Sequence, residues 1–305
     1  MSELTDKTRL KKRDWYGYLF IAPFFIVYTI FHLMPILNTI FLSFTDLWGF
    51  NTEYTFVGFK NYIDILHNEL FFKAFINTLI VWGMNYLPQI GLALFLAALF
   101  VSNHDKIRGE GMFKVLFYMP NIITAASIAI LFISLFASPN GSINLLLVDL
   151  GILKEPFNFY RDVTVTRIIV AFIGFWMWYG KTMIILLAGM KGINPNLYEA
   201  AEIDGANNRK KFTKITLPLL KPILLFVFIT NFAGGMRMFD IPFLLTDGGP
   251  NYAVETISMF IYKQAFTGSQ NFYLASTASV YLLMFVSLVT FVLFKLFDDK
   301  EKEGK

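Results

Sequence analysis

The sequence predicts an all-α integral membrane protein with six transmembrane helices and both termini in the cytoplasm. Of its 305 residues, 56% are hydrophobic and only 16% are charged, a composition too apolar for a soluble globular domain. The apolar residues form continuous runs rather than alternating with polar ones, which favours helices over strands in lipid. Lys and Arg gather in every second connection between these runs, and this pattern predicts the orientation.

Six apolar stretches are long enough to cross a bilayer core of roughly 30 Å, which takes about 20 helical residues. The first follows a basic N-terminal segment, but it is too long for a signal peptide and no small-residue cleavage site closes it, so we predict an uncleaved span. The fifth is interrupted near its end by Asn231, Gly234, Gly235 and Arg237. The predicted spans are 16–44, 72–101, 112–137, 165–190, 217–238 and 272–297.

The distribution of Lys and Arg predicts which connections face the cytoplasm. The N-terminus, the 102–114 and 191–221 connections and the C-terminal tail together hold 18 of these residues, and the remaining connections hold 7. Because positive charge is retained on the cytoplasmic side, we expect both termini there, as an even number of spans also requires. The predicted organisation is a cytoplasmic segment 1–15, a transmembrane domain 16–297 and a cytoplasmic tail 298–305.

The residue types exclude several kinds of chemistry. The chain has no cysteine and only 3 His, so disulfides, thiol catalysis and a Cys- or His-based metal site are not expected. The segment from Gly174 to Thr182 approaches a phosphate-binding loop, but it has five residues between its glycines where four are needed and lies in an aromatic span. We therefore expect neither metal nor nucleotide on this chain. The net charge of +4 is assigned to cytoplasmic loops rather than to nucleic-acid binding.

The connection 191–218 begins with signals for a short helix. Asn194 or Asn196 can cap it, and Pro195 suits its first turn. Glu199 lies three residues after Asn196, as in a capping box. A helix between the fourth and fifth spans is therefore predicted.

The same connection predicts how this helix ends. Gly205 can end it by taking a left-handed conformation, and a second short helix, about 209–215, is expected to stop at Pro218. The segment 203–206 is apolar for an exposed loop. On physical grounds it is equally consistent with docking into a groove on a partner and with a simple interfacial helix.

The spacing of this loop matches a known pattern. Glu199-Ala200-Ala201 precedes Gly205, and nine intervening residues separate Gly205 from Ile215-x-Leu217-Pro218. This order resembles the EAA loop of binding-protein-dependent ABC importers. Four more segments are similar to the first permease of the carbohydrate-uptake branch (the maltose, multiple-sugar and glycerol-3-phosphate type), namely Phe56–Tyr62, Asn77–Leu79, Leu116–Pro120 and Leu244–Pro250.

The resemblance implies a type I ABC importer permease fold and a set of partners. The loop would be a coupling helix seated in a cytoplasmic ATPase, with contacts from Glu199, Ala200, Ala201, Asp204, Gly205 and Ala206. Implied partners are a second homologous permease, two copies of the ATPase, an extracytoplasmic solute-binding protein and membrane lipid. ATP and Mg would be bound by the ATPase alone. The implied location is the cell (inner) membrane of a bacterium or archaeon, and the implied cargo is a sugar or oligosaccharide.

Lys181 is a charge inside the fourth span, nine residues from its C-terminal end, and such residues are functional by default. Gly174, Trp178 and Lys181 share one helix face by their spacing. This pairing suits a sugar, because the C–H face of a sugar can stack on an aromatic ring while its hydroxyl groups form hydrogen bonds with a neighbouring donor. The alternative is that Lys181 pairs with a carboxylate such as Asp240 while Trp178 merely packs.

The resemblance adds this span and the outer half of the next to the substrate path. It favours Ser127, Gly174, Met177, Trp178, Lys181 and Asn231. A lysine is not the family norm, so an anionic cargo stays open, with Lys181 and Arg237 as counter-charges. Asn85 and Gln89 could equally form hydrogen bonds between helices.

Two other classes compete with an importer subunit. A stand-alone secondary transporter or channel would leave the 199–218 loop without a role, and no inverted repeat is visible in the sequence. A membrane enzyme would need a reactive cluster, and the sequence has no cysteine, no His cluster and no paired carboxylates inside a span.

Overall fold

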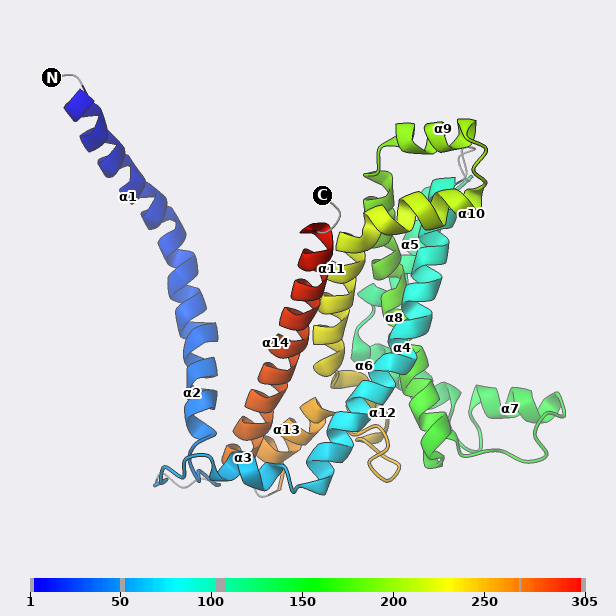
Figure 1. Ribbon diagram of the computed structural model, residues 1–305. Helices are drawn as coiled ribbons and strands as arrows, with labels where there is room; N and C mark the ends of the chain where they lie inside the picture. The colour runs from blue at the N-terminus through cyan, green and yellow to red at the C-terminus, as the bar shows by residue number, and fades with distance from the viewer. Residues whose placement is uncertain (1–2, 50–52, 103–107, 269, 303–305) are drawn as a thin grey trace. The chain divides into compact units, whose positions relative to one another are not determined.

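The computed structural model describes residues 3–49, 53–102, 108–268 and 270–302. Within these ranges the regular elements are all helical, and extended pairing is limited to one isolated bridge between Thr45 and Phe56 (Figure 1). Among the described residues, five helical segments are long and apolar enough to cross a membrane, and a bent pair makes a sixth if it counts as one span. The prediction of an all-α membrane protein is confirmed.

The chain divides into two compact units, and the first comprises residues 1–67 and 263–281. Its described part begins with α1 (Glu3–Tyr28), η1 (Thr29–Leu33) and α2 (Met34–Leu42), which together cover the predicted first span up to Leu42. The helix α3 (Lys60–Ile65) follows. Its buried Asn61 donates through Nδ2 to the carbonyl oxygens of Ser43 at 2.9 Å and Thr45 at 2.6 Å. This amide thereby ties α3 to the chain that leaves α2.

The second unit, residues 68–262 and 282–305, is built around α4 (Glu69–Ser102) and α8 (Val163–Lys191), which pack along one another. Glycines bring neighbouring helices close to this pair. A Cβ at Gly180 of α8 would overlap the backbone carbonyl of Phe117, and one at Gly235 would overlap the ring of Trp82. Small residues at such contacts are the usual basis of helix packing in membranes.

The predicted third span, 112–137, is not one continuous helix. It consists of α5 (Glu110–Ile122) and α6 (Ala125–Leu135), which meet at 90°. Ile123 and Thr124 between them are extended, and the Thr124 hydroxyl accepts the backbone N–H of Ser127 at 3.2 Å. This cap satisfies a first-turn donor of α6, so a new helix can begin there in another direction.

The expectation that the helix after Gly205 stops at Pro218 is also wrong. The chain stays helical through α10 (Asn208–Lys211), η3 (Phe212–Thr216) and α11 (Leu217–Met236). Proline lacks an N–H and its ring crowds the carbonyl four residues back. The π turn η3 accommodates this, because the N–H of Leu217 bonds to the carbonyl of Phe212, one residue further back than in an α-helix.

The remaining helices complete the two units. The predicted fourth, fifth and sixth spans correspond to α8, α11 and the last helix, and the second span corresponds to α4. Within the second unit, α9 and α10 lie at one end, whereas α7 and α12 lie toward the other (Figure 1). The elements not yet given are α7 (Ser142–Asp149), η2 (Phe159–Arg161), α9 (Pro195–Ile203), α12 (Asp240–Thr246), α13 (Ile257–Phe266) and α14 (Phe272–Lys302).

Candidate functional site

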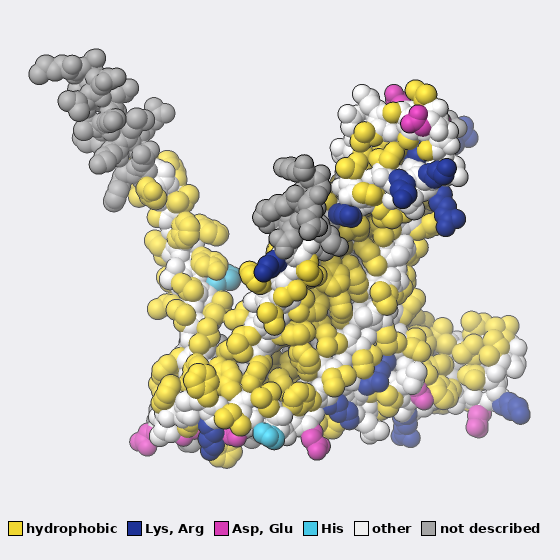
Figure 2. All heavy atoms as spheres, in the orientation of Figure 1, with side chains coloured by type: hydrophobic (Ala, Val, Ile, Leu, Met, Phe, Trp, Pro, Cys, Tyr) yellow, Lys and Arg dark blue, Asp and Glu magenta, His cyan; other side chains and the backbone are white. Residues whose placement is uncertain are grey.

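The helix α9 is exposed at the end of the second unit, between α8 and α10, and basic side chains gather beside it (Figure 2). Asn194 is its cap, because its side chain accepts the N–H of Asn196 at 3.0 Å. Of the two caps that the sequence allows, Asn194 is the one formed, so Glu199 takes no part in a capping box. Its carboxylate is exposed instead.

Gly205 ends α9 in the conformation that the sequence predicts. Its φ is +73°, a left-handed value that costs other residues about 1–2 kcal/mol. The N–H of Gly205 bonds to the carbonyl of Glu202 at 3.0 Å, and that of Ala206 bonds to Ala201 at 2.8 Å. These two bonds form a Schellman motif, which pairs the last carbonyls of the helix.

Two side-chain contacts hold α9 against the following helix. The hydroxyls of Tyr198 and the buried Thr216 of η3 are hydrogen-bonded at 2.8 Å. Lys211 of α10 forms an ion pair with Glu202 at 3.2 Å. Because α10, η3 and α11 are continuous, these contacts connect α9 directly to the fifth span.

The side chains that α9 presents outward include more than those predicted from the sequence. Glu199, Ala200, Asp204 and Gly205 are exposed, and Ala201 and Ala206 are half-buried. In addition, Ile203 is 88% exposed. It was not among the predicted coupling residues, although the apolar character of the segment 203–206 was the available signal.

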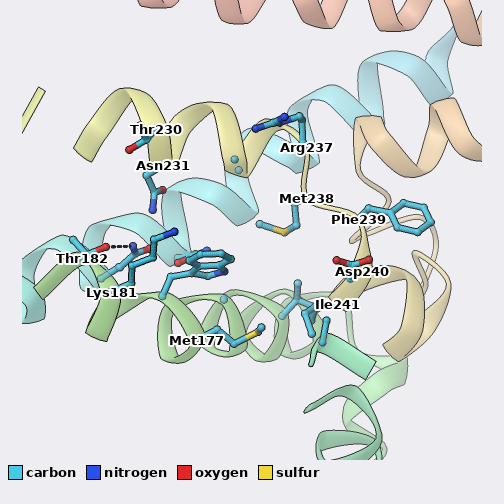
Figure 3. Close-up of a pocket in the computed structure, with 18 of the residues that line it drawn as sticks. Met177, Lys181, Thr182, Thr230, Asn231, Arg237, Met238, Phe239, Asp240 and Ile241 are labelled. Atoms are coloured by element: carbon cyan, nitrogen blue, oxygen red, sulfur yellow. Dashed lines mark hydrogen bonds between the residues drawn. The ribbon is translucent and has the colours of Figure 1, made fainter. Parts of the chain in front are cut away.

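A cavity of about 340 Å³ lies between α4, α8, α11 and the start of α12, inside the membrane-spanning part of the second unit (Figure 3). Five of the six predicted path residues line it: Gly174, Met177, Trp178, Lys181 and Asn231. The sixth, Ser127, is not among the lining residues. Its hydroxyl instead accepts a hydrogen bond from Thr124 at 2.9 Å, beside the cap of α6.

Lys181 forms no ion pair with a described carboxylate, so the pairing with Asp240 considered from the sequence is not formed. Its ammonium lies 5.0 Å from the centre of the Trp178 ring, within the range of a cation–π interaction. Trp178 itself is 41% exposed rather than packed in the interior. The pair therefore presents an aromatic face and a cation to the same cavity.

Asn231 faces Lys181 across this cavity, from α11 (Figure 3). Its Oδ1 accepts a hydrogen bond from the indole N–H of Trp82 at 3.0 Å, which leaves its amide nitrogen to donate. Arg237 and Asp240 also line the cavity near the end of α11. The arrangement can bind a polar molecule by hydrogen bonds, charge and stacking.

Two residues of α4, Asn85 and Gln89, line the cavity as well. The sequence allows hydrogen bonds between helices for both, and for Gln89 this is confirmed, because its Nε2 donates to Thr182 of α8 at 2.7 Å. Among the described residues, no group of three or more His, Asp or Glu is placed to hold a metal ion.

The bundle places polar side chains in a cavity among its spanning helices, an arrangement typical of membrane transport proteins. Residues 89–303 match the family described as the binding-protein-dependent transport system inner membrane component, and the chain belongs to this family. It is a multi-pass inner-membrane protein and a transport subunit rather than an enzyme.

Several relatives are similar over nearly their whole length. The lactose transport system permease protein LacF of Rhizobium radiobacter is 32% identical, over 95% of this chain and 97% of that protein. The arabinooligosaccharides transport system permease protein AraP of Bacillus subtilis is 32% identical, over 94% and 90%. The sn-glycerol-3-phosphate transport system permease protein UgpA of Escherichia coli is 30% identical, over 94% and 95%.

The fold is also that of a solved importer. One chain of a bacterial ABC transporter involved in the import of the acidic polysaccharide alginate matches with a TM-score of 0.81 and 23% identity, over 95% of this chain and 98% of that chain. A second structure, of an alginate transporter in complex with a pentasaccharide-bound periplasmic protein, matches with a TM-score of 0.79. The predicted ABC importer permease fold is confirmed.

Proposed function

We propose that this chain and a second, homologous permease form the path of an ATP-driven saccharide importer, with α9 docked in a cytoplasmic ATPase. The exposed end of α9 is the single observation that carries the proposal. Ile203 is 88% exposed at a helix end that Gly205 caps, and a short helix that presents one apolar anchor suits a groove on a partner.

The topology supports this placement of α9. The basic residues of α10 and η3 lie beside it, and connections rich in Lys and Arg stay in the cytoplasm. An even number of spans then puts both termini on that side. The partners would be two ATPase copies, which bind ATP and Mg, and an extracytoplasmic solute-binding protein.

The cavity is the proposed share of the path in this chain. Gly174, Met177, Trp178, Lys181 and Asn231 line it, and stacking on Trp178 beside the donors Lys181 and Asn231 suits a saccharide. The relatives include permeases named for lactose and arabinooligosaccharides, which supports a sugar cargo.

The docking of α9 also gives a mechanism of coupling. Closure of the ATPase pair would move α9, and the Tyr198–Thr216 hydrogen bond and the Lys211–Glu202 ion pair would transmit the movement to α11. Since α11 lines the cavity through Asn231, a shift of α11 would change access to the cargo site.

Gly205→Asp tests the proposal against a matched control. Gly151 ends α7 at the opposite end of the unit with φ of +70° and the same two hydrogen bonds, from Gly151 to Val148 and from Ile152 to Leu147. A Cβ added at either glycine would have no neighbouring atom within 4 Å, so both substitutions impose the same backbone strain. Gly205→Asp should abolish ATPase co-purification and ATP-dependent uptake, and Gly151→Asp should retain both. If Gly205→Asp leaves association and uptake unchanged, the coupling proposal fails.

A further inference from the structure

Two amide side chains of α4 face the cavity one helical turn apart. Asn85 is 6% exposed and Gln89 is 1% exposed, and both line the cavity. Residues four apart lie on the same helix face, so the two amides form one polar strip. The path predicted from the sequence involves other helices and does not include this strip.

The side-chain oxygen of each amide has no hydrogen-bond partner. Among the described residues, the buried side-chain N and O atoms without a hydrogen-bond partner are Asn85 Oδ1 and Gln89 Oε1. The other end of Gln89 is held, because Nε2 donates to Thr182 at 2.7 Å. A buried carbonyl without a donor is costly, above all within a membrane. Both oxygens belong to residues that line the cavity, so the donors of a bound ligand are candidate partners for them.

Gly174 makes room for this strip. A Cβ at Gly174 would lie 2.5 Å from Nδ2 of Asn85, which is too close for the amide to stay where it is. The glycine predicted to line the path therefore has a positioning role, because its missing side chain leaves room for the Asn85 amide in its present position.

The strip complements the donors on the other helices. Lys181 and Asn231 offer N–H groups from α8 and α11, whereas the free atoms of α4 can only accept. A ligand that satisfies both must donate on one side and accept on another, and neighbouring hydroxyl groups do this. We infer that Asn85 and Gln89 are specificity-determining residues, whose free carbonyl oxygens accept hydrogen bonds from hydroxyl groups of the saccharide.

This inference rests on the proposed function, and one uptake experiment tests the two separately. The complete transporter, with its second permease, ATPase and binding protein, is reconstituted in proteoliposomes. ATP-dependent uptake is measured for radiolabelled lactose, maltotriose, arabinotriose and trigalacturonate. For the saccharide that the wild type transports, Gln89→Met and Asn85→Leu should each lower uptake about five- to tenfold, the loss of one or two hydrogen bonds, with ATPase association retained.

Two further variants separate a cargo contact from a structural one. Thr182→Val removes the same interhelical hydrogen bond as Gln89→Met but keeps Oε1 of Gln89. Its decrease in uptake should therefore be less than half of the decrease that Gln89→Met causes. Gly174→Ala displaces only the Asn85 amide and should lower uptake in the same direction as Asn85→Leu. It remains informative if Asn85→Leu fails to assemble.

Each of the remaining outcomes would contradict either the inference alone or the proposed function as well. If Thr182→Val matches Gln89→Met, Gln89 is structural and the inference fails. If Gln89→Met, Asn85→Leu and Gly174→Ala all transport normally, the free oxygens are hydrated and the inference fails alone. If the wild type takes up none of the four saccharides, the proposed function fails and the inference falls with it.

Discussion

The exposed end of α9 and the cavity of the second unit differ in the kind of group that is left without a partner. At α9 both helix ends are capped, by Asn194 and by Gly205, and the exposed group is the apolar Ile203. In the cavity the unpaired groups are polar, at Asn85 and Gln89, within an apolar bundle. Each region thus holds a group that its surroundings disfavour. We interpret both as sites for a partner, a protein at α9 and a solute in the cavity, in keeping with the proposals above.

The largest effect should come from charging the apolar anchor. Ile203→Asp places a carboxylate where a partner groove is expected, and we predict that ATPase association weakens by about 2 kcal/mol or more, roughly 30-fold. Binding of the purified ATPase to the permease pair, measured by titration, checks this. Ile152→Asp is the control, because Ile152 is 65% exposed at the opposite end of the unit. If both variants weakened ATPase association equally, the two ends of the unit would not differ in ATPase binding, and the docking of α9 would be contradicted.

A smaller effect should follow from removing the cation of the cavity. Lys181→Met should lower uptake of an anionic trisaccharide by roughly tenfold, because a hydrogen bond to a charged group is lost, and that of a neutral one by less. Lys181→Arg, which keeps the charge, should retain most of the uptake. Reconstituted uptake of trigalacturonate and maltotriose measures both. If Lys181→Met affects neither saccharide, Lys181 is not part of the path.

The smallest effect concerns the contact that connects the two regions. Tyr198→Phe removes the hydroxyl that bonds to Thr216 at 2.8 Å. It should lower the free energy of local opening of α9 by about 1 kcal/mol. Hydrogen exchange should then become faster in α9 but not in α6. Tyr160→Phe removes a comparable hydroxyl, bonded to the carbonyl of Phe132 at 2.8 Å, and should show the reverse. Unchanged exchange in α9 would mean that Tyr198 does not hold it.

The sequence predicted the α9 region well because its signals are local. A capping Asn and a left-handed Gly act within a few residues, and both take the predicted conformation. The turn at Thr124 was not predicted, because the apolar run 112–137 continues across it. Ser127 was assigned to the path through the family resemblance, and the structure places its hydroxyl beside the cap of α6.

The cavity was predictable only in part. The spacing of Gly174, Trp178 and Lys181 correctly placed them on one face, since helix geometry is periodic. The state of Asn85 and Gln89 depends on which atoms of other helices reach them, and spacing along one helix carries no information about that. Likewise, the continuation of the helix past Pro218 depends on the π turn before it, which the sequence does not signal.

The central claim is that the end of α9 docks in a cytoplasmic ATPase, and cross-linking tests it most directly. The chain has no cysteine, so Ile203→Cys and Ile152→Cys each introduce a unique thiol, one at each end of the second unit. In the assembled transporter, a short thiol-to-amine cross-linker at position 203 should join this chain to the ATPase, and the same reagent at position 152 should not. Failure to cross-link from position 203, or equal cross-linking from position 152, would contradict the account.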